Sequence, residues 1–163
     1  MPSLTVTDMR YNNLDTESAT MLANIAKEKS ISLCGITPGQ TEADFTPSKN
    51  HYNKMKPADA ILLTADLAVI PSLTECKLRK NRLGVEGWTI VFNALRNSPT
   101  SKITTWDLSE EILGPEIAKP LAEYLSVTAS LTSLDISVNS IGAEGAKAIA
   151  EGLKDNASVT SVR

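Results

Sequence analysis

The chain has 163 residues, 42% of them hydrophobic and 21% charged, which are the proportions of one ordinary globular domain. Its formal net charge of −3 argues against nucleic acids and anionic membranes as partners, because both require a concentrated basic surface. No apolar run approaches the roughly 18 residues of a membrane span, and the N-terminus lacks the apolar core of a secretory signal. We therefore expect a cytoplasmic protein, with the nucleus as the alternative location.

One apolar pattern recurs along the chain, and its clearest copy lies at 130–156. Leu131 to Ile141 carries the apolar positions of a short strand and turn. The apolar stripe of the helix that follows consists of Ala146, Ile149, Ala150 and Leu153. The same pattern begins at Ile103 and at Leu73, which gives intervals of 131 − 103 = 28 and 103 − 73 = 30 residues. A strand, turn and helix of this size cannot bury its apolar face alone, so copies must stack on one another.

The first copy spans about 3–30 and consists of a predicted strand followed by a predicted helix. Thr7 stands where the pattern expects an apolar residue, so this terminal repeat is degenerate, as terminal repeats usually are. Its strand side carries Leu4, Met9, Asn12 and Leu14, and its helix side carries Ala19, Leu22, Ala23 and Ala26.

The second copy, at about 41–70, is enlarged by an irregular insertion at about 31–55. We place its strand at Thr41–Phe45, because the alternative start at Phe45 would put a proline inside the strand ladder. The segment Ile31–Ile36 could pair with that strand as a hairpin, since Pro38-Gly39 is a turn dipeptide. Lys56-Pro57 is a favourable helix start, because the missing N–H of proline is not needed there.

The later copies keep the pattern more closely. Pro120 falls within a helix predicted from Pro115 to Leu125, so we expect a kink or a restart there. Val159 begins a further strand. The predicted single domain, 1–163, therefore contains repeats at about 3–30, 41–70, 72–100, 102–129 and 130–157 and a partial repeat at 158–163.

The clearest copy reads Leu131-x-x-Leu134-x-Ile136-x-x-Asn139-x-Ile141-Gly142-x-x-Gly145. This motif, at a period of about 28 residues with a helix in each turn, resembles the ribonuclease-inhibitor-like subfamily of leucine-rich repeats. The resemblance implies an α/β solenoid in the form of a short horseshoe, with parallel strands on the concave face and helices on the convex face.

The same resemblance implies a role for one asparagine in each turn, whose side chain bonds backbone groups of adjacent turns. Asn12, Asn81 and Asn139 occupy that position, whereas Glu111 departs from it. Either the turn at Glu111 is looser, or its carboxylate accepts hydrogen bonds from the same backbone donors.

Side chains alternate along a strand, so the residues that flank the inward leucines should face the concave side. That face is expected to be mainly acidic, with a basic patch at Lys77 and Arg79. Its central column is expected to align Asp8, Asp44, Lys77, Asp107 and Asp135, and a neighbouring column to align Val6, Glu42, Glu75, Thr105 and Ser133. It could be a docking surface for a protein with basic segments, or simply a solvated polar sheet face. The predicted protein-binding residues are Asp8, Arg10, Glu42, Asp44, Glu75, Lys77, Arg79, Asp107 and Asp135.

Motifs of catalysis and of cofactor binding are missing from the sequence. It contains no phosphate-binding glycine loop, no Cys/His set at metal-ligand spacing and no nucleophile elbow, so we predict no enzyme, cofactor or metal. Cys34 and His51 could be imagined as a nucleophile and base, but the apolar surroundings of Cys34 predict a buried, unreactive thiol. Cys76 replaces a core leucine and should be buried as well.

The favoured function is a non-catalytic protein-binding module or scaffold that uses its concave face or its inserted segment. One alternative is a regulatory region, either a stimulator of GTP hydrolysis, for which Arg10 and Arg79 are the candidate arginines, or the sensor part of a larger receptor. Another is a structural subunit that associates end to end through the edge strands at Leu4 and Val159.

Overall fold

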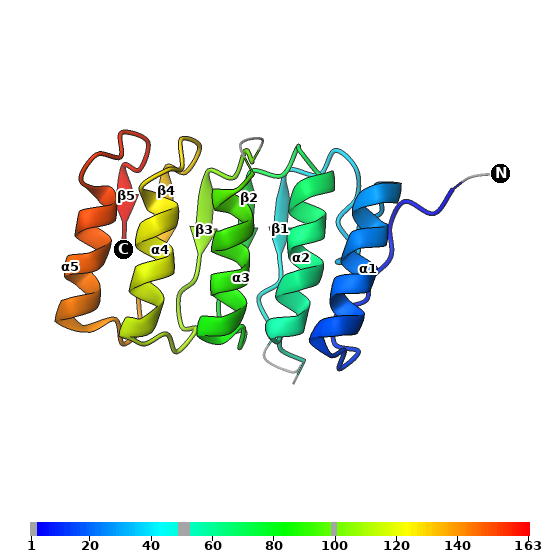
Figure 1. The fold of residues 1–163 in the computed structure, drawn as a ribbon, viewed down its shortest axis with the longest axis horizontal. Helices are drawn as coiled ribbons and strands as arrows, with labels where there is room; N and C mark the ends of the chain where they lie inside the picture. The colour runs from blue at the N-terminus through cyan, green and yellow to red at the C-terminus, as the bar shows by residue number, and fades with distance from the viewer. Residues whose placement is uncertain (1–2, 49–52, 99–100) are drawn as a thin grey trace.

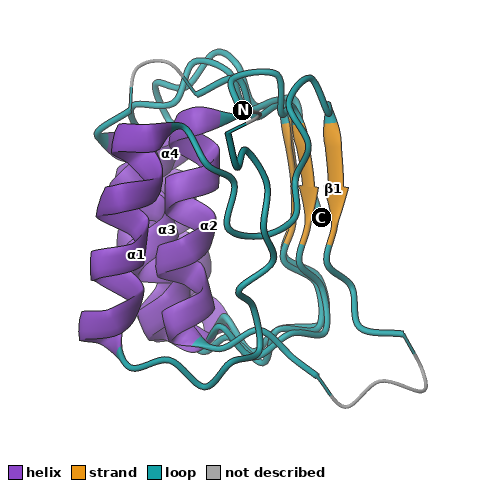
Figure 2. Cartoon of the chain, turned by 90° about the vertical axis from the view of Figure 1, so that its right-hand side faces the viewer, coloured by secondary structure: helices purple, strands orange, loops and turns teal. Residues whose placement is uncertain are grey.

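Residues 3–48, 53–98 and 101–163 are described by the computed structural model, in which helices and strands alternate along the chain. The strands form one layer, and the helices form a second layer that covers one face of the sheet (Figure 1, Figure 2). The helices are α1 (Thr16–Lys29), α2 (Pro57–Val69), α3 (Gly84–Arg96), the 3₁₀ helix η1 (Pro115–Ile117), α4 (Ala118–Leu125) and α5 (Gly142–Leu153). The strands are β1 (Glu42–Asp44), β2 (Glu75–Lys77), β3 (Thr105–Asp107), β4 (Ser133–Asp135) and β5 (Ser161–Val162).

The described strands form one open sheet in the order β1, β2, β3, β4, β5, and all pairs are parallel. The middle residue of each three-residue strand is buried, and these residues are Ala43, Cys76, Trp106 and Leu134. The predicted α/β solenoid, with parallel strands on one face and helices on the other, is therefore confirmed. The strand expected at Thr41–Phe45 is β1, and the alternative start at Phe45 is wrong.

A threonine ladder runs along the sheet at the residue that precedes each strand. From the second threonine onward, each hydroxyl donates to the backbone carbonyl of the threonine one turn earlier, at 3.1 to 3.2 Å. Because the same carbonyl also accepts backbone N–H groups of the following turn, the ladder fixes the strand register. Its members are Thr41, Thr74, Thr104, Thr132 and Thr160.

Asn81 and Asn139 bond adjacent turns as the resemblance implied, whereas the expectation is wrong for Asn12, whose side chain donates, among the described residues, only to the carbonyl oxygens of Met9 and Arg10 in its own turn. Asn81 accepts a hydrogen bond from the backbone N–H of Met55 at 2.9 Å and donates to the carbonyl oxygens of Phe45 and Leu78. Asn139 makes the equivalent contacts two turns further on, with Leu113, Leu108 and Ile136. Asn81 and Asn139 therefore each supply both an acceptor and a donor to backbone groups that would otherwise be buried without partners.

Glu111 provides only the acceptor half of this arrangement. Its Oε2 accepts from the backbone N–H of Leu83 at 3.3 Å and from the indole Nε1 of Trp88 at 3.2 Å. Its Oε1 is buried without a hydrogen-bond partner among the described residues. The expectation that this carboxylate accepts from the same backbone donors is confirmed.

The first repeat departs from the predicted geometry. Its helix forms as α1, with the carboxylate of Asp15 accepting the N–H of Ser18 at 2.7 Å as an N-cap. Its strand does not join the sheet: Val6 and Asp8 form only isolated bridges, to Ser32 and Cys34. The prediction that Asp8 aligns with Asp44 in one column of the sheet is therefore wrong.

The segment Ile31–Ile36 fills the space beside this first repeat. Pro38-Gly39 forms the expected turn, with the N–H of Gln40 donating to the carbonyl of Thr37 and Gly39 at a φ of 86°. The hairpin with β1 is wrong, because the segment pairs with Thr5–Met9 instead.

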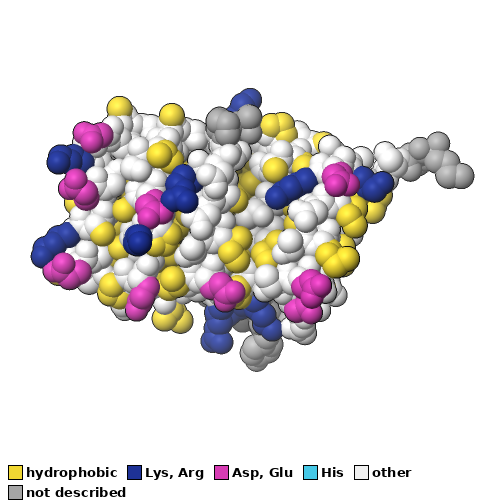
Figure 3. Space-filling view, in the orientation of Figure 1, with side chains coloured by type: hydrophobic (Ala, Val, Ile, Leu, Met, Phe, Trp, Pro, Cys, Tyr) yellow, Lys and Arg dark blue, Asp and Glu magenta, His cyan; other side chains and the backbone are white. Residues whose placement is uncertain are grey.

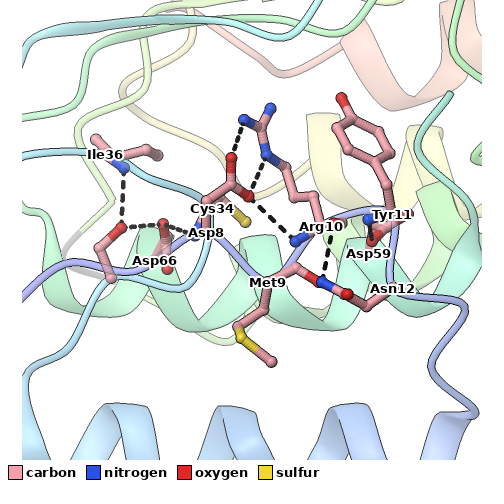
Figure 4. A network of polar contacts seen from close by, with 10 residues as sticks. Asp8, Met9, Arg10, Tyr11, Asn12, Cys34, Ile36, Asp59 and Asp66 are labelled. Atoms are coloured by element: carbon pink, nitrogen blue, oxygen red, sulfur yellow. Dashed lines mark hydrogen bonds and ion pairs between the residues drawn. The ribbon is translucent and has the colours of Figure 1, made fainter. Parts of the chain in front are cut away.

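Asp66 of α2 holds that segment in place. Its carboxylate is fully buried and accepts hydrogen bonds from the Ser32 hydroxyl at 2.7 Å and from the backbone N–H groups of Leu33 and Cys34 at 2.6 and 3.0 Å. Asp66 and Cys34 are labelled in Figure 4. One helical side chain therefore satisfies three donors of an irregular segment that lies over 30 residues earlier in the sequence.

The restart expected near Pro120 occurs upstream of it. A 3₁₀ turn at Pro115–Ile117 precedes α4, which begins at Ala118. Pro120 therefore lies in the first turn of α4, where its missing N–H costs no helical hydrogen bond. At the start of α2, Pro57 is the first helical residue, as predicted.

The last helix packs differently from the predicted stripe. Ile149 is buried and Leu153 is half-buried, but Ala146 and Ala150 are exposed, and the close contact with α4 is made by glycines. A methyl group at Gly152 would lie 2.6 Å from the carbonyl oxygen of Ala122. Close backbone approach therefore sets the distance between α4 and α5.

Replacing Gly152 by alanine should lower the free energy of unfolding by about 1 to 3 kcal/mol, because the added methyl group overpacks the helix contact. The loss should occur although alanine is the better helix former by about 1 kcal/mol. Urea denaturation of the variant measures it, with Ala150→Leu as an exposed control in the same helix. Equal or higher stability of the glycine variant would show that α4 and α5 separate at little cost.

Candidate functional site

The helices leave one face of the sheet uncovered (Figure 2), and this face is named here the open sheet face. It carries two columns of polar side chains. The register aligns Asp44, Lys77, Asp107 and Asp135 in one column. It aligns Glu42, Glu75, Thr105, Ser133 and Ser161 in the other. The expected alignment is confirmed for β1 to β4, and a role of these residues in binding stays a prediction.

The aspartates of the first column also shape the turns that follow the strands. Asp107 and Asp135 each accept a hydrogen bond from the backbone N–H two residues later, at 3.0 and 2.9 Å, and Asp44 does so at 2.9 Å. Such a contact imitates a backbone turn. Burial alone would raise the pKa of Asp135, but hydrogen bonds from Ser137 and nearby arginines hold it below its usual value.

The basic patch predicted on this face is paired with neighbouring carboxylates. Lys77 Nζ lies 3.0 Å from Glu75 Oε1, and this hydrogen bond raises the pKa of Lys77. Arg79 Nη2 lies 2.6 Å from Glu110 Oε1, which also lies 3.3 Å from Lys80 Nζ. The open sheet face therefore presents mixed charge with a net acidic balance.

Asp8 and Arg10 form a separate ion pair in the first repeat (Figure 4). Arg10 Nε and Nη2 donate to the two carboxylate oxygens of Asp8 at 2.9 and 2.6 Å, and these bonds lower the pKa of Asp8. The guanidinium also lies over the rings of Phe45, at 4.6 Å from the centroid, and Tyr11, at 5.2 Å. Arg10 is therefore held in place by its own chain.

A basic pocket of about 930 Å³ opens at the edge where the strands end and the helices begin. It is lined by the turn of the first repeat, by both sides of the β1 to α2 connection and by the turn after β2. Lysine and arginine side chains gather at the lower edge of the molecule beneath α2 and α3 in Figure 3. The cations that line the pocket are Lys54, Lys56, Arg79, Lys80 and Arg82.

Of these five cations, only Arg79 was among the residues predicted from the sequence. A signal was available, because aligned repeats place Asn13, Lys54, Arg82, Ile112 and Ser140 in one row, each just before an apolar residue that precedes a helix. Two cations therefore occupy the same place in consecutive turns. Alternation along the strands gives no information on turn residues, so it does not indicate this row.

The thiols and titratable groups show no catalytic arrangement within the described residues. Cys34 and Cys76 are both buried, and burial raises the pKa of each thiol, well above its usual value for Cys34. His51 lies outside the described residues. In the described part of the chain, no three His, Cys, Asp or Glu residues are grouped to hold a metal ion, and no helix is long and apolar enough to cross a membrane.

Residues 129–150 match a leucine-rich repeat family model. The matched residues contain β4 and most of α5, which is the copy with the clearest pattern. Together with the single sheet of parallel strands, the match supports a leucine-rich repeat protein. Such repeats generally form non-catalytic modules that bind other proteins. No curated protein matches the chain.

Proposed function

We propose that the chain is a non-catalytic protein-interaction module that binds a partner with basic segments through the open sheet face. The observation that carries the proposal is the uncovered column Asp44, Lys77, Asp107 and Asp135, which strand pairing holds in register. Mixed charge held on a rigid sheet suits electrostatic selection of a partner. The repeat match supports protein binding in general.

The proposal extends to the kind of repeat and to its location. Units of about 28 residues, each with a helix of two or more turns, support the ribonuclease-inhibitor-like subfamily. A cytoplasmic location accords with the absence of any disulfide framework in a chain with two cysteines.

Replacing Asp107 and Asp135 together by asparagine should remove the charge and keep the turn acceptors, because an asparagine oxygen can accept the same backbone N–H groups. We expect partner capture to fall by about tenfold, with a loss of stability of no more than about 1 kcal/mol. Affinity capture with the native chain and the variant as matched baits, followed by mass spectrometry, measures the loss. Recovery of the same proteins in the same amounts by both baits would exclude this part of the sheet as the site.

Stimulation of GTP hydrolysis gains no support from the candidate arginines. Arg10 is bonded twice to Asp8, and Arg79 is bonded to Glu110, so both guanidinium groups already have carboxylate partners in the same chain. A sensor role in a larger receptor and end-to-end association through the Val159 strand stay predictions, and light scattering tests the second.

A further inference from the structure

The basic pocket is a second candidate surface, with a charge opposite to that of the whole chain. Among the described residues that line it, five are lysine or arginine and none is aspartate or glutamate. The chain as a whole carries a net charge of −3, so the positive charge is concentrated locally at the pocket. Mutual repulsion among the cations is unfavourable without a bound anion, so the pocket has a physical reason to attract one.

Few of these cations are neutralised within the protein. Glu110 pairs with Arg79 and Lys80, and Lys56 Nζ donates to the neutral amide oxygen of Asn13 at 2.7 Å. Among the described residues, Lys54, Lys56 and Arg82 form no ion pair with a carboxylate. The Nε of Arg79 is also buried without a hydrogen-bond partner in the described part of the chain.

Carboxylate groups suit the pocket better than phosphate does. Glu110 shows that a carboxylate fits between Arg79 and Lys80. Phosphate commonly binds free N–H groups at a helix N-terminus, but α2 offers few, since Pro57 has none and the N–H of Lys56 already donates to Asp59 Oδ2 at 2.8 Å.

The size and walls of the pocket indicate a chain segment. Its volume of about 930 Å³ is far larger than one phosphate group, and the lining spans turns from three successive repeats. Tyr11 and Pro47 add apolar wall between the cations. A peptide with several acidic side chains fits such a pocket, because its backbone can pack against the apolar wall while its carboxylates pair with the cations.

We propose that the basic pocket binds an acidic peptide segment, rich in aspartate or glutamate, at a site separate from the acidic columns of the open sheet face. Glutamate or aspartate side chains would pair with Lys54, Lys56 and Arg82. This site does not depend on the function proposed for the sheet, because the two surfaces have opposite charge and select opposite partners.

Fluorescence polarisation with a labelled decapeptide of alternating glutamate and glycine tests the proposal. The native chain should bind this peptide and should not bind the matched peptide with glutamine in place of glutamate. Lys54→Glu with Arg82→Glu should weaken binding by at least about tenfold. The charge-matched control, Lys102→Glu with Lys119→Glu, changes two exposed lysines outside the pocket and should bind within about twofold of the native chain.

Three outcomes would overturn the proposal. They are equal binding of the glutamine peptide, equal weakening by the control variant, and binding of inorganic tripolyphosphate without binding of the glutamate peptide. Should the charge-reversed variant fail to fold, Lys54→Gln with Arg82→Gln is the second variant and should also weaken binding. The Asp107→Asn, Asp135→Asn variant should bind the peptide at least as tightly as the native chain, which separates this site from the open sheet face.

Discussion

Replacing Asp66 by alanine is expected to lower the free energy of unfolding by about 3 kcal/mol or more. The reason is that the substitution leaves the Ser32 hydroxyl and the backbone N–H groups of Leu33 and Cys34 buried without their shared acceptor. Burial raises the pKa of Asp66 even though these hydrogen bonds oppose the rise. The three hydrogen bonds that the carboxylate accepts therefore offset the free-energy cost of burying it.

Urea denaturation measures the loss in the free energy of unfolding, and thiol labelling measures the local opening of the segment Ile31–Ile36. Cys34 lies in the segment that Asp66 holds, whereas Cys76 lies in β2, so only Cys34 should become reactive in the folded variant. Ser32→Ala, which removes one of the three donors, should have a smaller effect of about 1 kcal/mol. A loss below about 1 kcal/mol for the alanine variant, with Cys34 still protected, would mean that the segment does not depend on Asp66.

Replacing Glu111 by glutamine is expected to stabilise the protein at pH 8 and to remove a pH dependence. Burial raises the pKa of Glu111 from 4.5 to about 7, and hydrogen bonds from Trp88 and backbone N–H groups only partly oppose this rise. An acid whose pKa is higher in the folded state binds more protons folded than unfolded. The contribution of Glu111 to stability is therefore highest below pH 4.5, falls as the pH rises from about 4.5 to about 7, and stays low above that.

The expected fall across this window is up to about 3 kcal/mol in the native chain, because each unit of pKa difference corresponds to about 1.4 kcal/mol. Glutamine can supply the donor that the asparagines supply in neighbouring turns, and it does not titrate. Urea denaturation at several pH values measures the slope, with the exposed Glu86→Gln as control. Parallel pH curves for the native chain and the Glu111 variant would contradict the assignment.

Much of the fold could be predicted from the chain's own regularity. A period of about 28 residues places one strand and one helix in each turn, and apolar residues that recur at fixed positions must share a core. Leu73, Ile103 and Leu131 are buried as that argument requires. The strand columns follow from the same period, because side chains alternate along each strand.

The repeat period does not predict the contacts between segments that lie far apart in the sequence. The segment Ile31–Ile36 reads as strand by its apolar residues, and no local feature shows that it pairs with Thr5–Met9. The buried carboxylate of Asp66 in α2 holds the segment in this position by accepting the backbone N–H groups of Leu33 and Cys34. The exposed alanines of α5 likewise depend on how closely Gly152 lets α4 approach.

Of the two candidate sites, one could be predicted from the sequence and the other depends on tertiary contacts. The open sheet face could be read from the sequence, because strand alternation and period are local properties that translate directly into a surface. The basic pocket forms where turns of three repeats and an insertion meet, and its shape depends on where Lys54 and Arg82 lie relative to Tyr11. The repeated pattern in the sequence is enough to predict the stacked layer of strands and the layer of helices. The structure of the irregular segments is decided by tertiary contacts, because their backbone donors and charges have no partner at the repeat spacing.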